Sequence, residues 1–153
     1  MNDLVISDRH VSSMSDEAIQ RVRAFEADAM AMPQSVLETD HVLHGGQYTR
    51  TIFMPAGLVI TGALIKVPTT LVVCGECQVF LGDCSRHLTG YHVLAASAGR
   101  KQAFAAIADT YLTMSFPTQA RTVEDAEREF TDEAHLLLSR SEYGKNVYTI
   151  TGE

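Results

Sequence analysis

Between residues 41 and 116, apolar residues occur in short runs that are rich in Val, Ile, Thr, Phe and Tyr and are separated by Gly and Pro. Such runs predict β-strands bounded by turns. We expect strands near 48–54, 58–66, 70–74, 77–81, 84–88, 91–95, 102–107 and 110–116. We expect turns at Gly75-Glu76, Gly82-Asp83 and Gly90. Connections this short leave no room for parallel crossovers, so the pattern predicts a mainly antiparallel sandwich or barrel.

Helical periods flank this region on both sides. Over residues 16–31, apolar positions recur at spacings of three and four, which predicts an amphipathic helix with Ser15 as its N-cap. A similar period begins after Thr122, where one long helix and two short helices are equally compatible with the pattern. Residues 140–153 are expected to form an exposed tail, or instead a short strand against a sheet edge or a partner.

The chain of 153 residues has a length that suits one compact domain. Within it we expect an N-terminal arm and helix over 1–40, a β-barrel over 41–117, and a C-terminal helical segment and tail over 118–153. Hydrophobic residues make up 46% of the chain and charged residues 20%, values typical of an ordered globular protein.

The charge and the cysteine count narrow the classes of partner. The net charge of −7 disfavours binding to nucleic acids and to anionic membranes, both of which attract basic surfaces.

The longest apolar runs are too short for a membrane-spanning helix, which needs roughly 20 residues. They are interrupted by Lys66, Pro68 and Glu76. The N-terminal residues lack the apolar core of a signal peptide. Three cysteines are a poor basis for disulfides, and we expect a cytoplasmic protein.

The cysteines provide the first candidate metal site. Cys74 and Cys77 form a C-x-x-C pair, and Cys84 and His87 form a C-x-x-H pair, a combination that resembles a four-ligand zinc site. The strand expected between the pairs spans roughly 13–17 Å, whereas zinc lies about 2.0–2.3 Å from every ligand. The two pairs are therefore expected at opposite ends of a strand, and buried or partly buried thiols are the better interpretation.

Histidines and polar strand residues provide weaker candidates. His41 and His44 precede a glycine pair in an expected loop, and His87 and His92 flank Gly90. No carboxylate lies at a telling spacing, which favours surface histidines. Four polar residues on otherwise apolar strands would line a ligand pocket in the barrel or pair with one another: Arg50, Gln102, Tyr111 and Thr113.

Lysine side chains on the strands have a simpler interpretation. Lys66, and as an alternative Arg50, would extend outward with the charged group in water. We favour this for Lys66, because lysine is rarely fully buried. The sequence contains neither a nucleophile elbow nor a phosphate-binding glycine-rich loop.

The segments PAGLVITGALIKVPTTLVVCGECQVFL and LTGYHVLAASAGRKQAFAAIADTYLTMSF resemble the two halves of the cupin fold. Gly57 and Gly75 match the bracketing glycines of the first cupin motif. Ser97-Ala98-Gly99 is similar to the Pro-x-Gly turn of the second motif, with Gly90 opening it. The resemblance covers about residues 48–116 and implies a jelly-roll β-barrel, with helices packed outside it, that forms a homodimer. The chain is also similar to small cupin-like proteins of tailed phages and prophages, which carry helical additions at both ends.

The resemblance also implies where a metal would bind, and there the sequence departs from the family. Metal-binding cupins use two histidines, a glutamate and a third histidine. The two histidine positions fall on Ala63 and Ile65, the glutamate position on Pro68 or Thr69, and the third histidine position on Gln102. None of these residues is a strong transition-metal ligand, so we expect no metal cofactor.

Our leading hypothesis is therefore a cupin-like protein without the usual metal ligands, which serves as a binding or assembly module and derives from a phage or prophage. The alternative is a metal-independent isomerase, epimerase or lyase that acts on a small sugar or carboxylic acid, with Tyr111, Arg50 and Gln102 as site residues. A third hypothesis is a metal-dependent cupin with relocated ligands drawn from His41, His44, His87 and His92.

Overall fold

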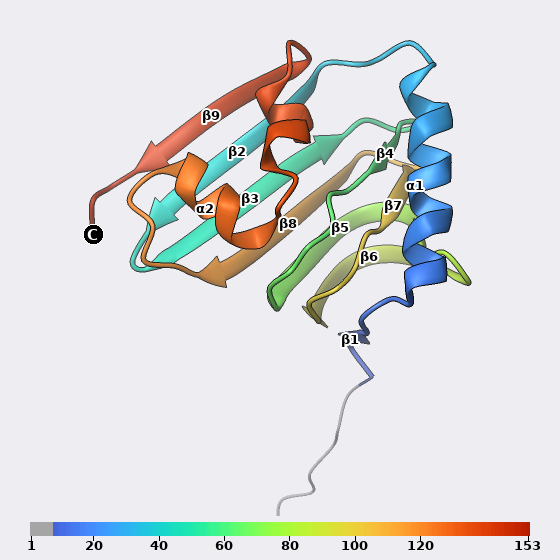
Figure 1. The fold of residues 1–153 in the computed structure, drawn as a ribbon, viewed down its shortest axis with the longest axis horizontal. Helices are drawn as coiled ribbons and strands as arrows, with labels where there is room; N and C mark the ends of the chain where they lie inside the picture. Colours follow the sequence, from blue (N-terminus) through green and yellow to red (C-terminus); the bar gives the residue numbers. More distant parts are fainter. Residues whose placement is uncertain (1–7) are drawn as a thin grey trace, which may run out of the picture.

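The computed structural model describes residues 8–153, and the first seven residues of the expected arm lie outside the described residues. Figure 1 shows a curved sheet with two helices. In chain order the elements are β1 (His10–Val11), α1 (Asp16–Met30), β2 (Leu37–His44), β3 (Gln47–Met54), β4 (Val59–Thr61), β5 (Thr69–Phe80), β6 (Ser85–Ala96), β7 (Ala103–Ala106), β8 (Thr110–Pro117), α2 (Val123–Phe130), the 3₁₀ turns η1 (Ala134–Leu136) and η2 (Leu138–Arg140), and β9 (Gly144–Ile150).

Strands β3 to β8 form a jelly roll. In one sheet β3 pairs with β8, and β8 pairs with the first half of β5; in the other sheet β4 pairs with β7, and β7 pairs with the second half of β5. Strand β6 follows β5 along its whole length and so belongs to both sheets. Two sheets with this pairing order are the arrangement of a jelly roll, and the expected mainly-β fold with flanking helices is confirmed.

The turns expected at Gly75-Glu76 and at Gly90 are wrong. The strands β5 and β6 run unbroken through both positions, and Gly75 lies opposite Gly90 in the ladder. Gly75 has a φ of 141° and Gly90 a φ of 90°, values that side-chain-bearing residues rarely adopt. A Cβ on Gly75 would lie 2.5 Å from the carbonyl oxygen of Asp109. The glycine pair bends the ribbon where β5 passes from one sheet to the other.

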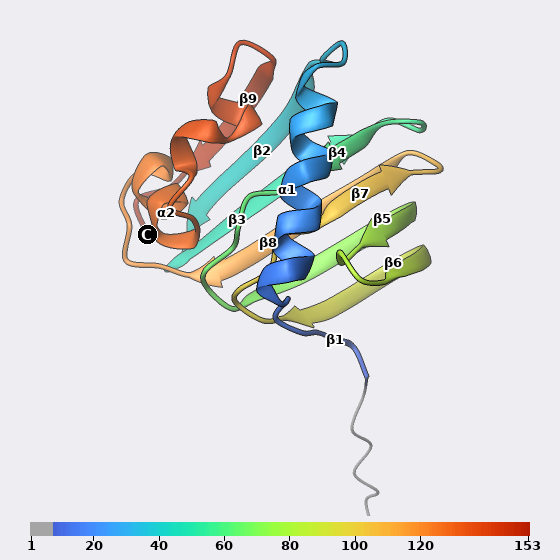
Figure 2. The same cartoon turned by 45° about the vertical axis from the view of Figure 1, so that its right-hand side comes forward.

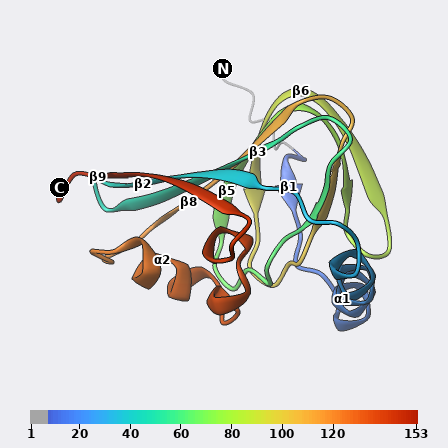
Figure 3. The ribbon, with the colours of Figure 1, turned by 90° about the horizontal axis from the view of Figure 1, so that it is seen from above.

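Strands β2 and β9 extend the first sheet beyond the barrel. β2 pairs antiparallel with β3, and β9 pairs parallel with β2. Figure 3 shows this extension lying flat beside the curved barrel. Because His41 and His44 belong to β2, the loop expected there is wrong. For residues 140–153, the strand alternative is the one observed.

The helices lie on one side of the sheet, and Figures 2 and 3 show α1 beside the barrel and α2 beneath the extension. The predicted helix α1 is confirmed, and the Ser15 side chain accepts a hydrogen bond from the Ala18 amide at 3.1 Å. The C-terminal segment forms one eight-residue helix followed by two 3₁₀ turns. Within residues 8–153, neither helix combines the length and the apolarity needed to cross a membrane.

Two apolar cores result from this arrangement. The barrel core lies between the two jelly-roll sheets and includes Met54, Leu71, Val73, Cys77 and Leu112. The second core lies between the extension and the C-terminal segment and includes Leu43, Tyr48, Phe116, Ala126 and Phe130.

Candidate functional site

The barrel interior is filled by apolar side chains. The cavity within it has a volume of about 10 Å³ and is lined mainly by valines and leucines, together with Arg86 and Gln102. A space of this volume accommodates about one water molecule. A sugar or a carboxylic acid substrate would need some hundreds of cubic ångströms. The barrel interior is therefore an unsuitable place for catalysis on such a substrate.

The positions that correspond to the cupin metal ligands do not fit a metal. Ala63 and Ile65 pack against the second core, Pro68 is exposed, and Thr69 binds a guanidinium group. Only Gln102 faces the barrel cavity. Across residues 8–153, no three side chains of His, Cys, Asp or Glu lie close enough together to hold a metal ion.

The cysteines and histidines of the other metal hypotheses are also dispersed. Cys77 is buried in the barrel core, where burial raises the pKa of its thiol, whereas Cys74 and Cys84 are exposed. The four candidate histidines have four different partners: His41 binds Tyr48, His44 binds Thr151, His87 binds Glu76, and His92 binds the carbonyl oxygen of Thr89.

A buried arginine lies next to Gln102. Arg100 donates to the Thr69 hydroxyl at 2.6 Å, to the Ser97 carbonyl oxygen at 2.7 Å and to Gln102 Oε1 at 3.2 Å. These partners are neutral, and burial lowers the pKa of Arg100 to about 10. The other end of the Gln102 amide, Nε2, has no hydrogen-bond partner among residues 8–153. This polar group fixes the Ser97–Gln102 segment at the end of the barrel.

A second buried cation fixes α1 to the barrel. Lys101 Nζ donates to the Gly62 carbonyl oxygen at 2.7 Å and to Glu26 Oε2 at 3.0 Å. The same Glu26 oxygen accepts from the Thr61 hydroxyl at 2.7 Å. Lys66, in contrast, is exposed and pairs with Asp132 at 2.6 Å, as the outward orientation predicted from the sequence requires.

Arg50 belongs to a third polar cluster, beneath the extension. Its guanidinium group donates to Glu127 Oε2 at 2.9 Å and to the Ser139 hydroxyl at 2.9 Å. Arg140 donates to the other Glu127 oxygen at 2.9 Å. A buried carboxylate is costly unless it is paired, and two arginines from different parts of the chain compensate Glu127. Sequence reasoning missed this pairing, because nothing in the local pattern connects residues 50 and 127.

The same cluster continues into β9 through a chain of hydrogen bonds. Arg50 donates to the Tyr48 hydroxyl at 3.3 Å, which in turn lies 2.7 Å from His41 Nδ1. Because the Tyr48 hydroxyl accepts from Arg50, its own proton is directed to His41 Nδ1, which accepts it. Burial lowers the pKa of His41, which favours the neutral ring that this bond requires. Nε2 then donates to Asn146 Oδ1 at 2.7 Å, and Asn146 donates to the Ser139 carbonyl oxygen at 2.7 Å. The cluster is fully paired and fastens the C-terminal segment and β9 to the sheet.

The four residues predicted to line one pocket lie in three separate places. Arg50 and Gln102 point inward but belong to different cores. Tyr111 and Thr113 point outward from β8; Tyr111 is 51% exposed, and Thr113 is hydrogen-bonded to the Thr51 hydroxyl at 2.8 Å. The structure does not bring them together around a ligand.

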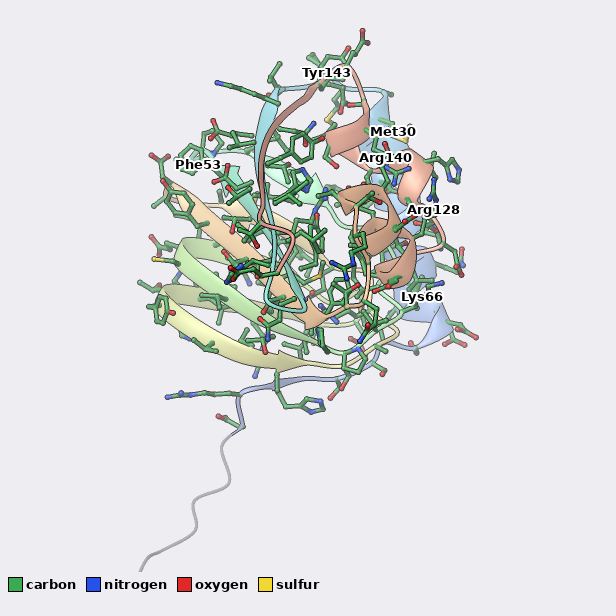
Figure 4. All side chains as sticks on the ribbon, turned by 90° about the vertical axis from the view of Figure 1, so that its left-hand side faces the viewer. Met30, Phe53, Lys66, Arg128, Arg140 and Tyr143 are labelled. Atoms are coloured by element: carbon green, nitrogen blue, oxygen red, sulfur yellow. The ribbon has the colours of Figure 1, made fainter. Side chains whose placement is uncertain are left out.

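Tyr111 and Thr113 instead belong to a broad outer surface, which we call the uncharged face. It covers β6, β5, β8 and β3 in three registered rows of outward-pointing residues. Its members are Tyr91, Val93, Ala95, Thr70, Val72, Cys74, Tyr111, Thr113, Ser115, Thr49, Thr51 and Phe53. Figure 4 shows Phe53 on the side of the sheet opposite to Arg128 and Arg140. The rings of Phe53 and Tyr111 lie 5.0 Å apart between centroids.

Comparisons with known proteins give structural likenesses only, because no protein-family model and no curated protein matches this sequence. A cupin-2 domain protein from Shewanella frigidimarina aligns with a TM-score of 0.43 and 11% identity over 65% of this chain and 97% of that chain. An RmlC-like cupin from Desulfovibrio desulfuricans aligns with a TM-score of 0.45 and 17% identity, over 53% of this chain and 81% of that chain. A cupin superfamily protein from Desulfitobacterium hafniense aligns with a TM-score of 0.45 and 12% identity, over 60% of this chain and 86% of that chain. Likenesses at this level carry no information about activity or ligand.

Proposed function

We propose that this protein is a binding or assembly module and that the uncharged face pairs it with a second copy of the chain. The observation that carries the proposal is the absence of any charged residue among the twelve members of the uncharged face, in a chain with a net charge of −7. Tyr, Val, Phe and Thr side chains in register provide apolar contact with some hydroxyl groups, a composition typical of protein interfaces.

Charge favours a second copy as the occupant of this face. Two copies of a protein with net charge −7 repel one another through most of their surfaces. A twofold axis through the uncharged face brings together uncharged side chains at the centre of the interface, so this repulsion is smallest there. Such an interface is self-complementary by symmetry.

The extent of the face suits a modest interface. Strands lie about 4.8 Å apart and outward residues repeat every ~6.6 Å, so six strands by three residues cover roughly 570 Å² in projection. The two extra strands add Val42, Val147 and Thr149 to the three rows, together with the charged Glu38, Asp40 and Lys145. Specific interfaces begin near 600 Å² per partner, or about 1,200 Å² in total. The interface that we propose therefore has the uncharged face at its centre and the extension, with these charged residues, at its rim.

The alternative function, a metal-independent enzyme, has less support. It needs a titratable side chain in an enclosed polar cavity, whereas the barrel cavity is about 10 Å³ and mostly apolar. Tyr111, its natural acid or base, lies on the outer surface. The filled interior and the outward tyrosine both favour a module that acts through its surface.

The test compares solution masses of two matched variants. Thr113 lies in the middle of the uncharged face, and Thr113→Lys would place two like charges close together across the twofold axis. The control, Gln20→Lys, adds the same charge at an exposed position of α1. Light scattering should show a lower mass for Thr113→Lys than for wild type and Gln20→Lys. An unchanged mass in Thr113→Lys, with the wild type associated, would reject this face as the interface.

The phage or prophage origin is a separate part of the proposal, and only the sequence resemblance to phage-borne cupin-like proteins supports it. Neighbouring genes for phage structural proteins would support that origin, and an unrelated metabolic neighbourhood would remove it.

A further inference from the structure

The outermost strand of the extension, β9, has a free edge. The Leu37 amide donates to the Tyr143 carbonyl oxygen at 2.9 Å, and the Thr151 amide donates to the Leu43 carbonyl oxygen at 3.3 Å. Because backbone groups alternate in direction along a strand, the odd-numbered residues of β9 direct their N–H and C=O groups toward β2. The even-numbered residues direct theirs away from the sheet.

Three residues therefore present backbone donors and acceptors at the edge: Asn146, Tyr148 and Ile150. Among residues 8–153, no strand pairs with this side of β9. Gly144 does not join them, because its amide already donates to the Ser141 carbonyl oxygen at 3.1 Å. An edge of this kind is a template for pairing with another strand.

Side chains do little to block this edge. Val147, Tyr148 and Ile150 are 46%, 56% and 52% exposed, and Lys145 is the one charged residue within β9. The strand is also flat and lacks proline (Figure 3).

The edge strand at the other side of the sheet, β6, is better protected against pairing. It is bent at Gly90, carries the basic or titratable residues Arg86, His87 and His92, and pairs with β1 at one end. Bends and charges are the usual protections of an edge strand, and β9 has the fewest of them.

We propose that two copies of this chain join edge to edge through β9, antiparallel, about a twofold axis at Tyr148. In this register Tyr148 faces the partner's Tyr148, and Asn146 faces the partner's Ile150. The outward N–H and C=O groups of Asn146, Tyr148 and Ile150 in each copy then pair with those of the partner, which forms six backbone hydrogen bonds. Lys145 faces the partner's Thr151, so no like charges oppose one another. A second copy is the occupant because the edge complements itself in both hydrogen bonding and charge.

This edge interface is distinct from the uncharged face and does not depend on it. A chain with two different self-complementary interfaces forms an assembly larger than a dimer. The edge thus deepens the proposed assembly function, and each interface can be removed while the other remains.

The experiment uses the full chain with a matched pair of substitutions at one position. Ile150→Pro removes an outward N–H and places a ring against the partner strand, while the pairing of β9 with β2 keeps its own hydrogen bonds. Ile150→Ala removes the same side chain but keeps the N–H. Light scattering should show a lower mass for Ile150→Pro than for wild type and a largely retained mass for Ile150→Ala. Circular dichroism should show that both variants are folded.

Amide hydrogen exchange provides an independent readout. In the wild-type assembly the amides of Asn146, Tyr148 and Ile150 should be protected although they point away from β2, and those of Asn146 and Tyr148 should exchange rapidly in Ile150→Pro. Rapid exchange of these amides in the wild-type assembly would overturn the edge interface.

The two proposals fail in different ways. If Ile150→Pro keeps the wild-type mass while Thr113→Lys lowers it, the edge interface is rejected and the uncharged face stands. If Ile150→Pro lowers the mass while Thr113→Lys does not, the uncharged face is rejected and the edge interface stands. A monomeric wild type would overturn both.

Discussion

The barrel and the extension are stabilised by different interactions, although one sheet runs through both. The barrel core is formed mainly by Val, Leu, Met and Phe side chains and contains a cavity of about 10 Å³. The extension covers a paired polar cluster in which Arg50, Glu127 and His41 are nearly inaccessible to solvent. The barrel thus relies on apolar burial, which is non-directional, whereas the extension relies on a specific set of partners that must all be present. The interior of the barrel is largely filled, and its cavity of about 10 Å³ accommodates about one water molecule.

The largest expected effect comes from breaking the polar cluster of the extension. Glu127→Ala leaves the buried Arg50 without its carboxylate and removes the partner of Arg140. Removing one member of a buried ion pair costs about 3–5 kcal/mol. Urea unfolding should show this loss, and the exposed Glu124→Gln should change stability by less than about 0.5 kcal/mol. An effect of Glu127→Ala as small as that of the control would show that the cluster does not hold the extension.

Truncation in the barrel core tests the other side of the comparison. Leu112→Ala removes buried apolar volume, which costs roughly 2–5 kcal/mol. Because the loss is apolar, we expect it to be insensitive to pH and salt, unlike a change in the polar cluster. A strong pH dependence of the Leu112→Ala effect would contradict this separation of the two regions.

A smaller effect is expected at Tyr48. Tyr48→Phe keeps the ring but removes the hydroxyl that accepts from Arg50 and donates to His41. An unsatisfied buried polar group costs about 1–3 kcal/mol. Thermal unfolding should show a decrease of a few degrees for each kcal/mol lost. No decrease would indicate that other partners replace the hydroxyl.

The smallest effect is the part of the pH dependence of stability that comes from His41, which a comparison with a His41 variant isolates. Burial lowers the pKa of His41 below its ordinary value of about 6.5, so the unfolded chain takes up this proton more readily than the folded one. The stability that neutral His41 provides is therefore fully present above about pH 6.5 and is lost as the pH falls toward the folded pKa, by up to ~1.4 kcal/mol per pH unit. In the His41→Gln variant this contribution should be absent, so the free energy of unfolding should fall less steeply as the pH is lowered below about 6.5. Equal slopes in the two proteins would contradict the assignment.

Local patterns in the sequence predicted the parts of the fold that depend on local interactions. The apolar stripe and the Ser15 cap predicted α1, and alternation predicted the strand over 110–116. At Gly75 and Gly90 the sequence predicts turns, because glycine marks both turns and bends and only the pairing between β5 and β6 distinguishes them. Strand β2 was not predicted. Its inward residues include the polar Thr39 and His41, so apolar and polar residues do not alternate along it as they do in other strands.

The candidate site was harder to predict, because it depends on which strands become neighbours. Alternation already placed Tyr111 and Thr113 on the face opposite to Leu112. Only the register of four strands shows that they join Val72 and Phe53 in one uncharged surface. Likewise, no local signal joins Arg50 to Glu127 across 77 positions.

The most direct test of the central claim, that this protein acts by self-association rather than through a pocket, is its mass in solution over a wide range of protein concentration. Sedimentation analysis should give at least twice the 16.8 kDa of the chain, with a decrease when Thr113→Lys is introduced. A mass of 16.8 kDa at every concentration would contradict the account.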